Sequence, residues 1–191
     1  ATVSLSGVIT EFGIGEAFLH RSPETRDEEA AAAIHFTLNA MITLAWAAVL
    51  SVVALLSTEG QTRLAILLLA SGGLVSRLCR TPRLILTRRV VHRRVALLAL
   101  IDVLLSTAVA LSLAWQGVTL GALLAIDLTR SALNLLLLYM WRPVWKPHFA
   151  WSSSVIKYFL QFGSQAFLIR ILGRALDRAD DLWVGRYLGK T

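Results

Sequence analysis

The sequence predicts an all-α protein, a bundle of helices that crosses a membrane several times. Of its 191 residues, 56% are hydrophobic and only 16% are charged, and the mean hydropathy is +0.65. A soluble domain holds about a quarter charged residues, so this balance is typical of a membrane protein. The net charge of +7 is concentrated in short links between long apolar segments, which is the pattern of a polytopic chain.

Four apolar segments are candidates for membrane-crossing helices. They are residues 30–56, 64–75, 95–115 and 118–140. The first runs for 27 residues without a formal charge, more than the ~20 that a helix needs to cross the hydrocarbon. The second crosses only if its helix extends past Arg63 or Arg77. Residues 4–20 are similar to the end of an earlier crossing, and a final helix is expected over about 155–185.

The links between these segments predict the orientation of the chain. Seven arginines and no acid lie in residues 77–94, and residues 142–157 are basic as well. The positive-inside rule therefore makes both links cytoplasmic, together with residues 20–29, and leaves residues 57–62 and 116–117 outside. The stretch TPRLILTRRVVHRR (81–94) is expected to form a short helix on the inner surface.

Several classes of function are excluded by what the sequence lacks. Topology accounts for the basic residues, so no nucleic-acid partner is expected. Cys79 is the only cysteine, which excludes an internal disulfide and a Cys-based metal site. The sequence has no Gly-rich phosphate loop, HExxH, CxxC or Ser/His/Asp arrangement. We therefore expect neither an enzyme nor a bound cofactor or metal.

Polar residues within the apolar segments are the candidate site. A charge in a span costs roughly 2.5–3.5 kcal/mol, so such residues should face protein or water. By helical phase, each set shares one face of its helix: Asp127, Arg130, Ser131 and Asn134 in the fourth segment, Asp102 and Ser106 in the third, and His35, Asn39 and Trp46 in the first. Facing stripes of this kind would enclose a hydrated cavity, in which a guanidinium suits a phosphate group.

Simpler interpretations of the same residues stay open. Asp127 and Arg130 can neutralise one another within their helix, and His35 and Asn39 can hydrogen-bond a neighbouring helix without touching a substrate. In the final helix, Arg170 and Arg174 share a polar face with Gly163 and Asp177. That face predicts a spanning helix, although a helix lying on the membrane surface would show the same two faces.

Three stretches of the sequence carry motifs that are found together in one family of membrane proteins. The run EFGIGEAFLHRSPETRDEEAAAAIHFTLN carries a Phe12-Gly13-Ile14-Gly15 turn, a basic residue and then acids. The run TPRLILTRRVVHRRVALLALIDVLLSTAVALSLAWQGVTLGAL is similar to the family's Pro-Arg segment, double arginine and following span. The run YFLQFGSQAFLIRILGRALDRADDLWVGRYLG carries Asp180, Gly185 and Gly189. Together the three runs resemble the Wzx-type polysaccharide flippases of the multidrug/oligosaccharidyl-lipid/polysaccharide exporter superfamily, in which these three residues are similar to markers of the seventh span.

The resemblance implies a fold like that of the multidrug exporters, with ~12 to 14 helices in two lobes that open alternately to each side. Residues 1–147 would supply about five helices of the N-lobe, the first partial, with the cytoplasmic link 77–94. Residues 148–191 would begin the C-lobe, so the chain is expected to be an internal part of a longer protein. The implied location is the bacterial inner membrane.

The resemblance also implies a substrate and partners. The substrate would be an undecaprenyl-diphosphate-linked oligosaccharide, and the partners would be membrane lipids and other polysaccharide assembly proteins. Arg130, Arg170 and Arg174 are the candidates for holding the diphosphate. Asp102 or Asp127 is the candidate for exchanging a coupling proton or cation. Replacing Arg130 by alanine is expected to abolish export while the protein stays folded.

Three alternatives belong to other classes. An exporter of drugs or metabolites would favour acids over arginines in its cavity. A membrane glycosyltransferase or polymerase would need a large external loop with catalytic residues. A scaffold that transports nothing would have polar stripes that complement one another, and mutating them would destabilise the protein.

Overall fold

The computed structural model describes residues 13–21, 28–57 and 60–187. Its elements are α2 (Ile14–His20), α3 (Glu28–Ser57), α4 (Gly60–Leu78), α5 (Arg80–Arg88), α6 (His92–Trp115), α7 (Thr119–Leu135), the π-helix η1 (Leu136–Trp141) and α8 (Ser153–Tyr187). These ranges contain helices and no strand. The predicted all-α fold is confirmed.

Four of the helical segments are long and apolar enough to cross a membrane. They are Glu28–Leu56, Gly60–Arg88, His92–Trp115 and Leu120–Trp141. The second starts before Arg63 and continues beyond Arg77. The span around residues 64–75 is therefore long enough to cross a membrane, which the sequence alone did not decide. The helix α8 is longer than the predicted 155–185 but is not among these four candidates, which were sought in the described residues.

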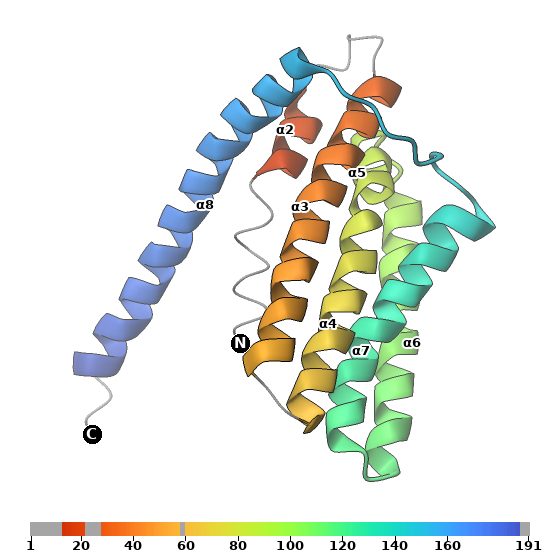
Figure 1. Ribbon diagram of the computed structural model, residues 1–191, viewed down its shortest axis with the longest axis vertical. Helices are drawn as coiled ribbons and strands as arrows, with labels where there is room; N and C mark the ends of the chain where they lie inside the picture. The colour runs from red at the N-terminus through yellow and green to blue at the C-terminus, as the bar shows by residue number, and fades with distance from the viewer. Residues whose placement is uncertain (1–12, 22–27, 58–59, 188–191) are drawn as a thin grey trace.

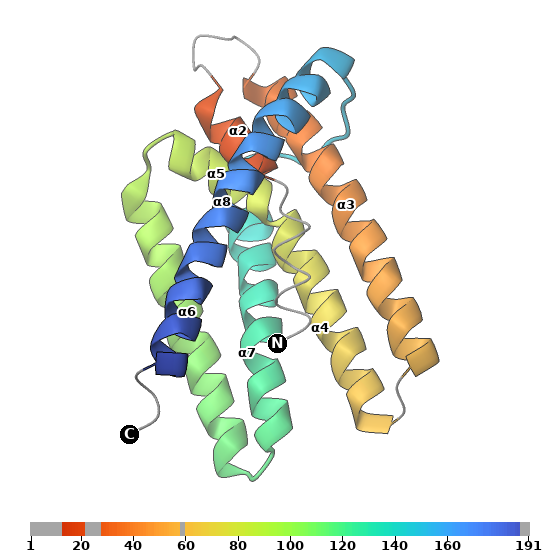
Figure 2. The same cartoon turned by 90° about the vertical axis from the view of Figure 1, so that its left-hand side faces the viewer.

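The four candidate spans stand side by side in a row rather than around a common axis. In both views the order across the row is α3, α4, α7 and α6 (Figures 1 and 2), and each helix packs on the next. The hairpin between α6 and α7 turns at Gly117, which has a φ of +81° and where an added Cβ would meet no atom within 4 Å. Because α3 and α6 lie at opposite ends of the row, their polar stripes do not face each other as the predicted cavity requires.

The remaining helices gather at one end of the row. There α2 packs against α3, α5 and the first turns of α8, and α8 then leans away from the row (Figure 1). The buried core at this end includes Phe18, Ile85, Trp145 and Phe159. The short helix predicted within 81–94 is present as α5, from Arg80 to Arg88. Its buried side packs into the bundle, with Pro82 and Ile85 almost fully covered.

Glycines allow α2 to pack closely against its neighbours at this end. Gly13 caps α2 with a φ of +62°, and a Cβ placed there would lie 2.3 Å from the carbonyl oxygen of Gly163 in α8. Only glycine fits a position that needs both a left-handed backbone and contact with another backbone. The neighbouring Gly15 leaves room for the guanidinium of Arg80, 3.1 Å from its ideal Cβ. Two glycines of the Phe-Gly-Ile-Gly motif, Gly13 and Gly15, thus have a packing role.

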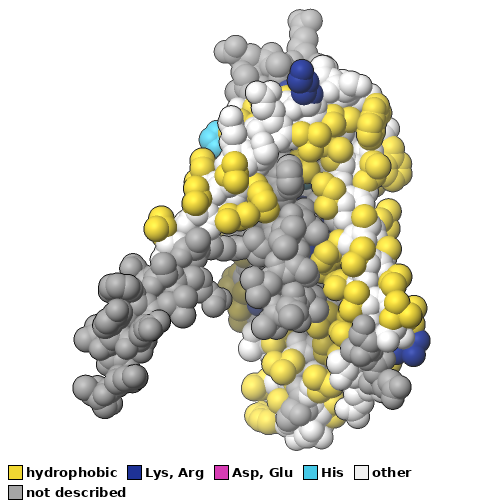
Figure 3. All heavy atoms as spheres, turned by 60° about the vertical axis from the view of Figure 1, so that its left-hand side comes forward, with side chains coloured by type: hydrophobic (Ala, Val, Ile, Leu, Met, Phe, Trp, Pro, Cys, Tyr) yellow, Lys and Arg dark blue, Asp and Glu magenta, His cyan; other side chains and the backbone are white. Residues whose placement is uncertain are grey.

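The outward faces of the row are apolar. Hydrophobic side chains run along the bundle (Figure 3), and large ones are exposed on α3 (Val49, Val52, Leu56) and on α6 (Leu100, Leu104, Leu111). A soluble protein rarely exposes apolar surface of this extent. Hydrocarbon is the solvent that suits such faces, so the chain is a membrane protein.

Candidate functional site

The break between α4 and α5 organises the candidate site. Pro82 has no N–H group, so the carbonyl of Leu78 loses its donor in the helix. The hydroxyl of Tyr139 in η1 donates to that carbonyl at 2.8 Å. From the other side, the side-chain amide of Asn39 in α3 donates to the carbonyl of Arg77 at 2.7 Å. Side chains from two neighbouring elements thereby fix the backbone where the helix bends.

Three arginines follow one another at this break, one helical turn apart. Arg77, Arg80 and Arg83 line a recess of about 330 Å³ together with Ser76, Cys79, Leu84, Thr87 and Asn134. No aspartate or glutamate is among these described lining residues. The recess is therefore electropositive, and guanidinium groups bind phosphate oxygens through paired hydrogen bonds.

Neutral groups position two of these guanidiniums. Arg83 donates to the side-chain oxygen of Asn134 in α7 at 3.4 Å. The guanidinium of Arg77 lies 3.9 Å from the centroid of the Trp46 ring, a cation–π contact. Gly73 makes space for that ring, because a Cβ at this position would lie 3.0 Å from it. Two polar residues singled out in the sequence, Asn39 on α3 and Asn134 on α7, therefore contact Arg77 and Arg83 at the break.

His35 lies in the core beside the recess. It is 1% exposed, and its Nδ1 lies 3.0 Å from the hydroxyl of Thr81, the residue before Pro82. The rings of Phe18 and Phe159 contact it, with centroid distances of 5.4 and 6.3 Å. This position ties α3 to α2, α5 and α8. A contact between His35 and a substrate stays a prediction.

Part of the polar stripe on α7 faces α4. The hydroxyl of Ser131 lies 2.8 Å from the carbonyl oxygen of Gly72 and 2.7 Å from that of Asp127. A Cβ on Gly72 would touch Leu128 at 3.3 Å, so the two helices cross closely. Ser131 and Asn134 are buried at this crossing. The polar residues that share one face of α7 in the sequence therefore include residues at its contact with α4.

The charged candidates in the spans are less enclosed. The side chain of Asp127 is exposed and that of Arg130 is half-buried, and no ion pair between these two described residues is found. The Nε of Arg130 and the Oδ1 of Asp102 are both buried without a hydrogen-bond partner. Such polar atoms are costly in a membrane protein, and they mark these residues for functional tests.

Other predicted site residues fall outside the described part of the chain. The side chains of Arg170, Arg174 and Asp180 lie outside it, although all three residues belong to α8. Gly185 is also in α8, while Phe12 and Gly189 lie beyond the described residues. Among the described residues, no group of three His, Cys, Asp or Glu side chains is placed to hold a metal ion.

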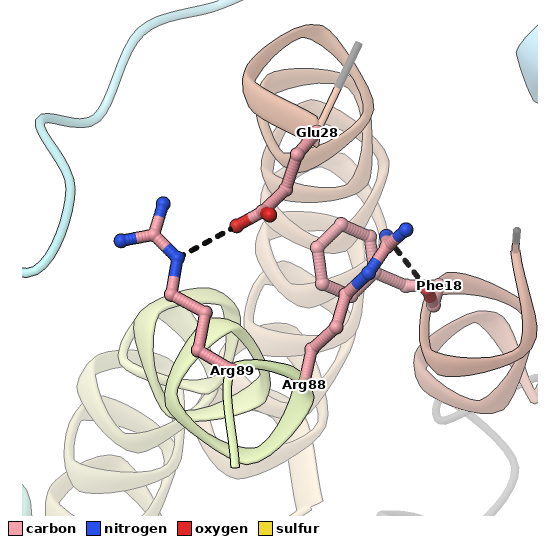
Figure 4. Close-up of polar contacts among 4 residues, drawn as sticks. All are labelled: Phe18, Glu28, Arg88 and Arg89. Atoms are coloured by element: carbon pink, nitrogen blue, oxygen red, sulfur yellow. Dashed lines mark hydrogen bonds and ion pairs between the residues drawn. The ribbon is translucent and has the colours of Figure 1, made fainter. Parts of the chain in front are cut away.

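The remaining arginines of the link have different surroundings. Arg88 donates to the carbonyls of Phe18 and Arg21, at 3.3 and 3.0 Å, and its guanidinium lies 5.3 Å from the Phe18 ring centroid. Arg89 forms an ion pair of 2.9 Å with Glu28 in the first turn of α3 (Figure 4). These contacts hold α5 against α2 and α3. Arg88 and Arg89 are therefore structural.

Sequence reasoning missed Arg77, Arg80 and Arg83 as site residues, because it counted them only as a topology signal. Their spacing of three residues, with Pro82 among them, was the available indication. A helix places residues three apart on neighbouring positions of one side. A proline inside such a segment marks the place where other elements must supply hydrogen bonds.

The fold and the site define a class, a polytopic helical membrane protein with an electropositive recess at one end of its bundle. The chain belongs to the polysaccharide biosynthesis protein family, whose sequence model matches residues 1–191. This membership confirms the family resemblance seen in the sequence and gives the protein a role in polysaccharide biosynthesis. No curated protein and no solved structure matches the chain.

Proposed function

We propose that the protein is a flippase, which moves an undecaprenyl-diphosphate-linked oligosaccharide from the cytoplasmic to the outer leaflet of the bacterial inner membrane. Such a substrate makes three demands on its carrier. Its sugars need a polar path, its diphosphate needs cations, and its polyprenyl tail needs an opening to the lipid. Membership of the polysaccharide biosynthesis family supports a carrier of this kind, as do four helical segments that are long and apolar enough to cross a membrane.

The recess lined by Arg77, Arg80 and Arg83 carries the proposal. A diphosphate presents several oxygens with spread negative charge, which planar guanidiniums bind in pairs. The described lining of the recess contains three arginines and no aspartate or glutamate. Asn134 orients Arg83 through a neutral oxygen, so this contact does not cancel the positive charge. An exporter of cationic drugs would need the opposite charge at this place.

The proposal is tested by substitution in cells that lack the chromosomal gene. Arg83→Gln keeps a polar side chain but removes the charge, and the matched control is Arg63→Gln, an exposed arginine near the other end of α4. A hydrogen bond to a charged group contributes about 1.5–3 kcal/mol, so Arg83→Gln should slow export roughly tenfold to a hundredfold. Arg130→Ala, at a half-buried arginine of α7, should abolish export.

The measurements are surface polysaccharide, lipid-linked oligosaccharide on each leaflet, and the amount of protein in the membrane. The expected result is accumulation on the cytoplasmic leaflet with unchanged protein in Arg83→Gln and normal export in Arg63→Gln. Normal export by Arg83→Gln would remove the recess from the mechanism. Loss of the protein from the membrane, in step with loss of export, would support the scaffold alternative instead.

A further inference from the structure

A second depression lies at the arginine-rich end of the bundle, between α6 and η1. It has a volume of about 670 Å³ and is lined by Val91, Arg93, Arg94, Leu97, Leu98, Ile101, Leu137, Trp141 and Arg142. The basic residues come from the first turn of α6 and from the residue after η1, whereas the lower turns of α6 supply apolar side chains. This groove therefore has a charged mouth and an apolar floor.

The mouth is set up for an anion. Arg93 and Arg142 are exposed, and Arg94 donates to the carbonyl of Arg142, which ties the start of α6 to the end of η1. No carboxylate is among the described lining residues, and none of the three arginines forms an ion pair with a described residue. Basic residues in the first turn of a helix oppose its dipole. A bound anion would relieve both that conflict and the mutual repulsion of the arginines.

A strained turn holds the arginines in place. Val90, a β-branched residue, has a φ of +57° in the tight connection between α5 and α6. Its N–H donates to the carbonyl of Thr87, and the N–H of Val91 donates to that of Leu86, both at 3.1 Å. A non-glycine residue with positive φ persists only where its surroundings enforce it, and such positions cluster at ligand sites.

The floor is suited to an acyl chain. Leu97 is 49% exposed and Trp141 is 67% exposed, whereas Leu98 and Leu137 beneath them are buried. A tryptophan at this level is typical of the boundary between headgroups and hydrocarbon. A soluble anion has no apolar part that would bury the floor of the groove. The ligand that matches both parts is an amphiphile with an anionic head.

The groove is separate from the arginine recess. The two share no lining residue. The buried cluster of Cys79, Leu86, Leu98, Leu137 and Leu138 lies between them, since Cys79 lines the recess and Leu98 and Leu137 line the groove. An occupant of the groove therefore contacts the lipid-facing side of α6 and η1.

We propose that this groove binds an anionic glycerophospholipid of the adjacent leaflet, with its phosphate at Arg93, Arg94 and Arg142 and an acyl chain along Leu97 and Ile101. Basic pockets between membrane helices are known to take anionic lipid headgroups. The bound lipid would brace the connection between α6 and η1. This site does not depend on the proposed transport function, because its ligand is a component of the membrane itself.

The test is lipid binding by the full-length protein, measured by native mass spectrometry. Phosphatidylglycerol is the probe, and phosphatidylcholine of the same acyl composition is the neutral comparison. The double variant Arg93→Gln/Arg142→Gln removes two charges from the mouth, leaving Arg94 and its structural bond in place. The matched control, Arg63→Gln/Lys157→Gln, removes two exposed charges outside the groove.

The proposal predicts retention of phosphatidylglycerol over phosphatidylcholine, with affinity about thirtyfold weaker in the double variant and unchanged in the control. Equal retention of the two lipids would overturn it, as would equal loss in the control. Glycerol phosphate, added as the headgroup alone, should not displace the lipid; displacement would make the groove a site for a soluble anion. Preferential displacement by undecaprenyl diphosphate would assign the groove to the transported substrate instead.

Discussion

Replacing Gly13 by alanine is expected to destabilise the protein by about 2–6 kcal/mol, from two effects of similar size. A φ of +62° is unfavourable for any residue with a Cβ, which contributes about 1–3 kcal/mol. The new Cβ would also lie 2.3 Å from the backbone oxygen of Gly163. A backbone atom cannot rotate away, so α2 must move from α8, and such overpacking costs about 1–3 kcal/mol.

Substitutions at two other glycines separate the backbone effect from the effect of the contact with Gly163. Gly60 and Gly117 have φ values of +63° and +81°, and a Cβ at either would meet nothing within 4 Å. Alanine at these positions should therefore show only the backbone effect, about 1–3 kcal/mol. Unfolding of the purified protein in mixed micelles, followed by circular dichroism, gives the free energies. The reasoning fails if Gly13→Ala is no more destabilising than Gly60→Ala.

Two further substitutions test the break and the arginine contacts. Tyr139→Phe leaves the Leu78 carbonyl without its donor and should lower the free energy of unfolding by about 1–3 kcal/mol; Tyr158→Phe, on an exposed side chain, should change it by less than about 0.5 kcal/mol. A comparable loss in both would refute the role of Tyr139. Arg88→Gln removes two bonds to α2 and should speed amide exchange there at least tenfold, whereas unchanged exchange would show that α2 is held by apolar packing alone.

The spans were predictable because the mean hydropathy of a segment depends on many residues and not on any single one. Residues 30–56 and 95–115 needed no knowledge of their neighbours. The segment 64–75 was harder, since Arg63 and Arg77 interrupt it at both ends. The candidate span nonetheless runs from Gly60 to Arg88, across α4 and α5, as arginine side chains near the ends of a span can reach the interface.

The site was predictable only in part. His35, Asn39 and Asn134 stood out as polar residues in apolar helices, and all three make contacts at the break between α4 and α5. Their partners were not predictable, because a backbone carbonyl such as that of Arg77 carries no sequence signal. Helical phase gives the face of a helix but not the neighbour that it meets. For that reason the stripes predicted one enclosed cavity, whereas the row of helices separates α3 from α6.

The leaflet distribution of lipid-linked oligosaccharide in a strain lacking the gene tests the proposed function most directly. Inverted and right-side-out membrane vesicles, probed with a glycan-binding protein that does not cross membranes, report the two leaflets separately. The account predicts accumulation on the cytoplasmic leaflet, with surface polysaccharide lost and then restored by the intact gene. An unchanged distribution with normal surface polysaccharide would contradict it.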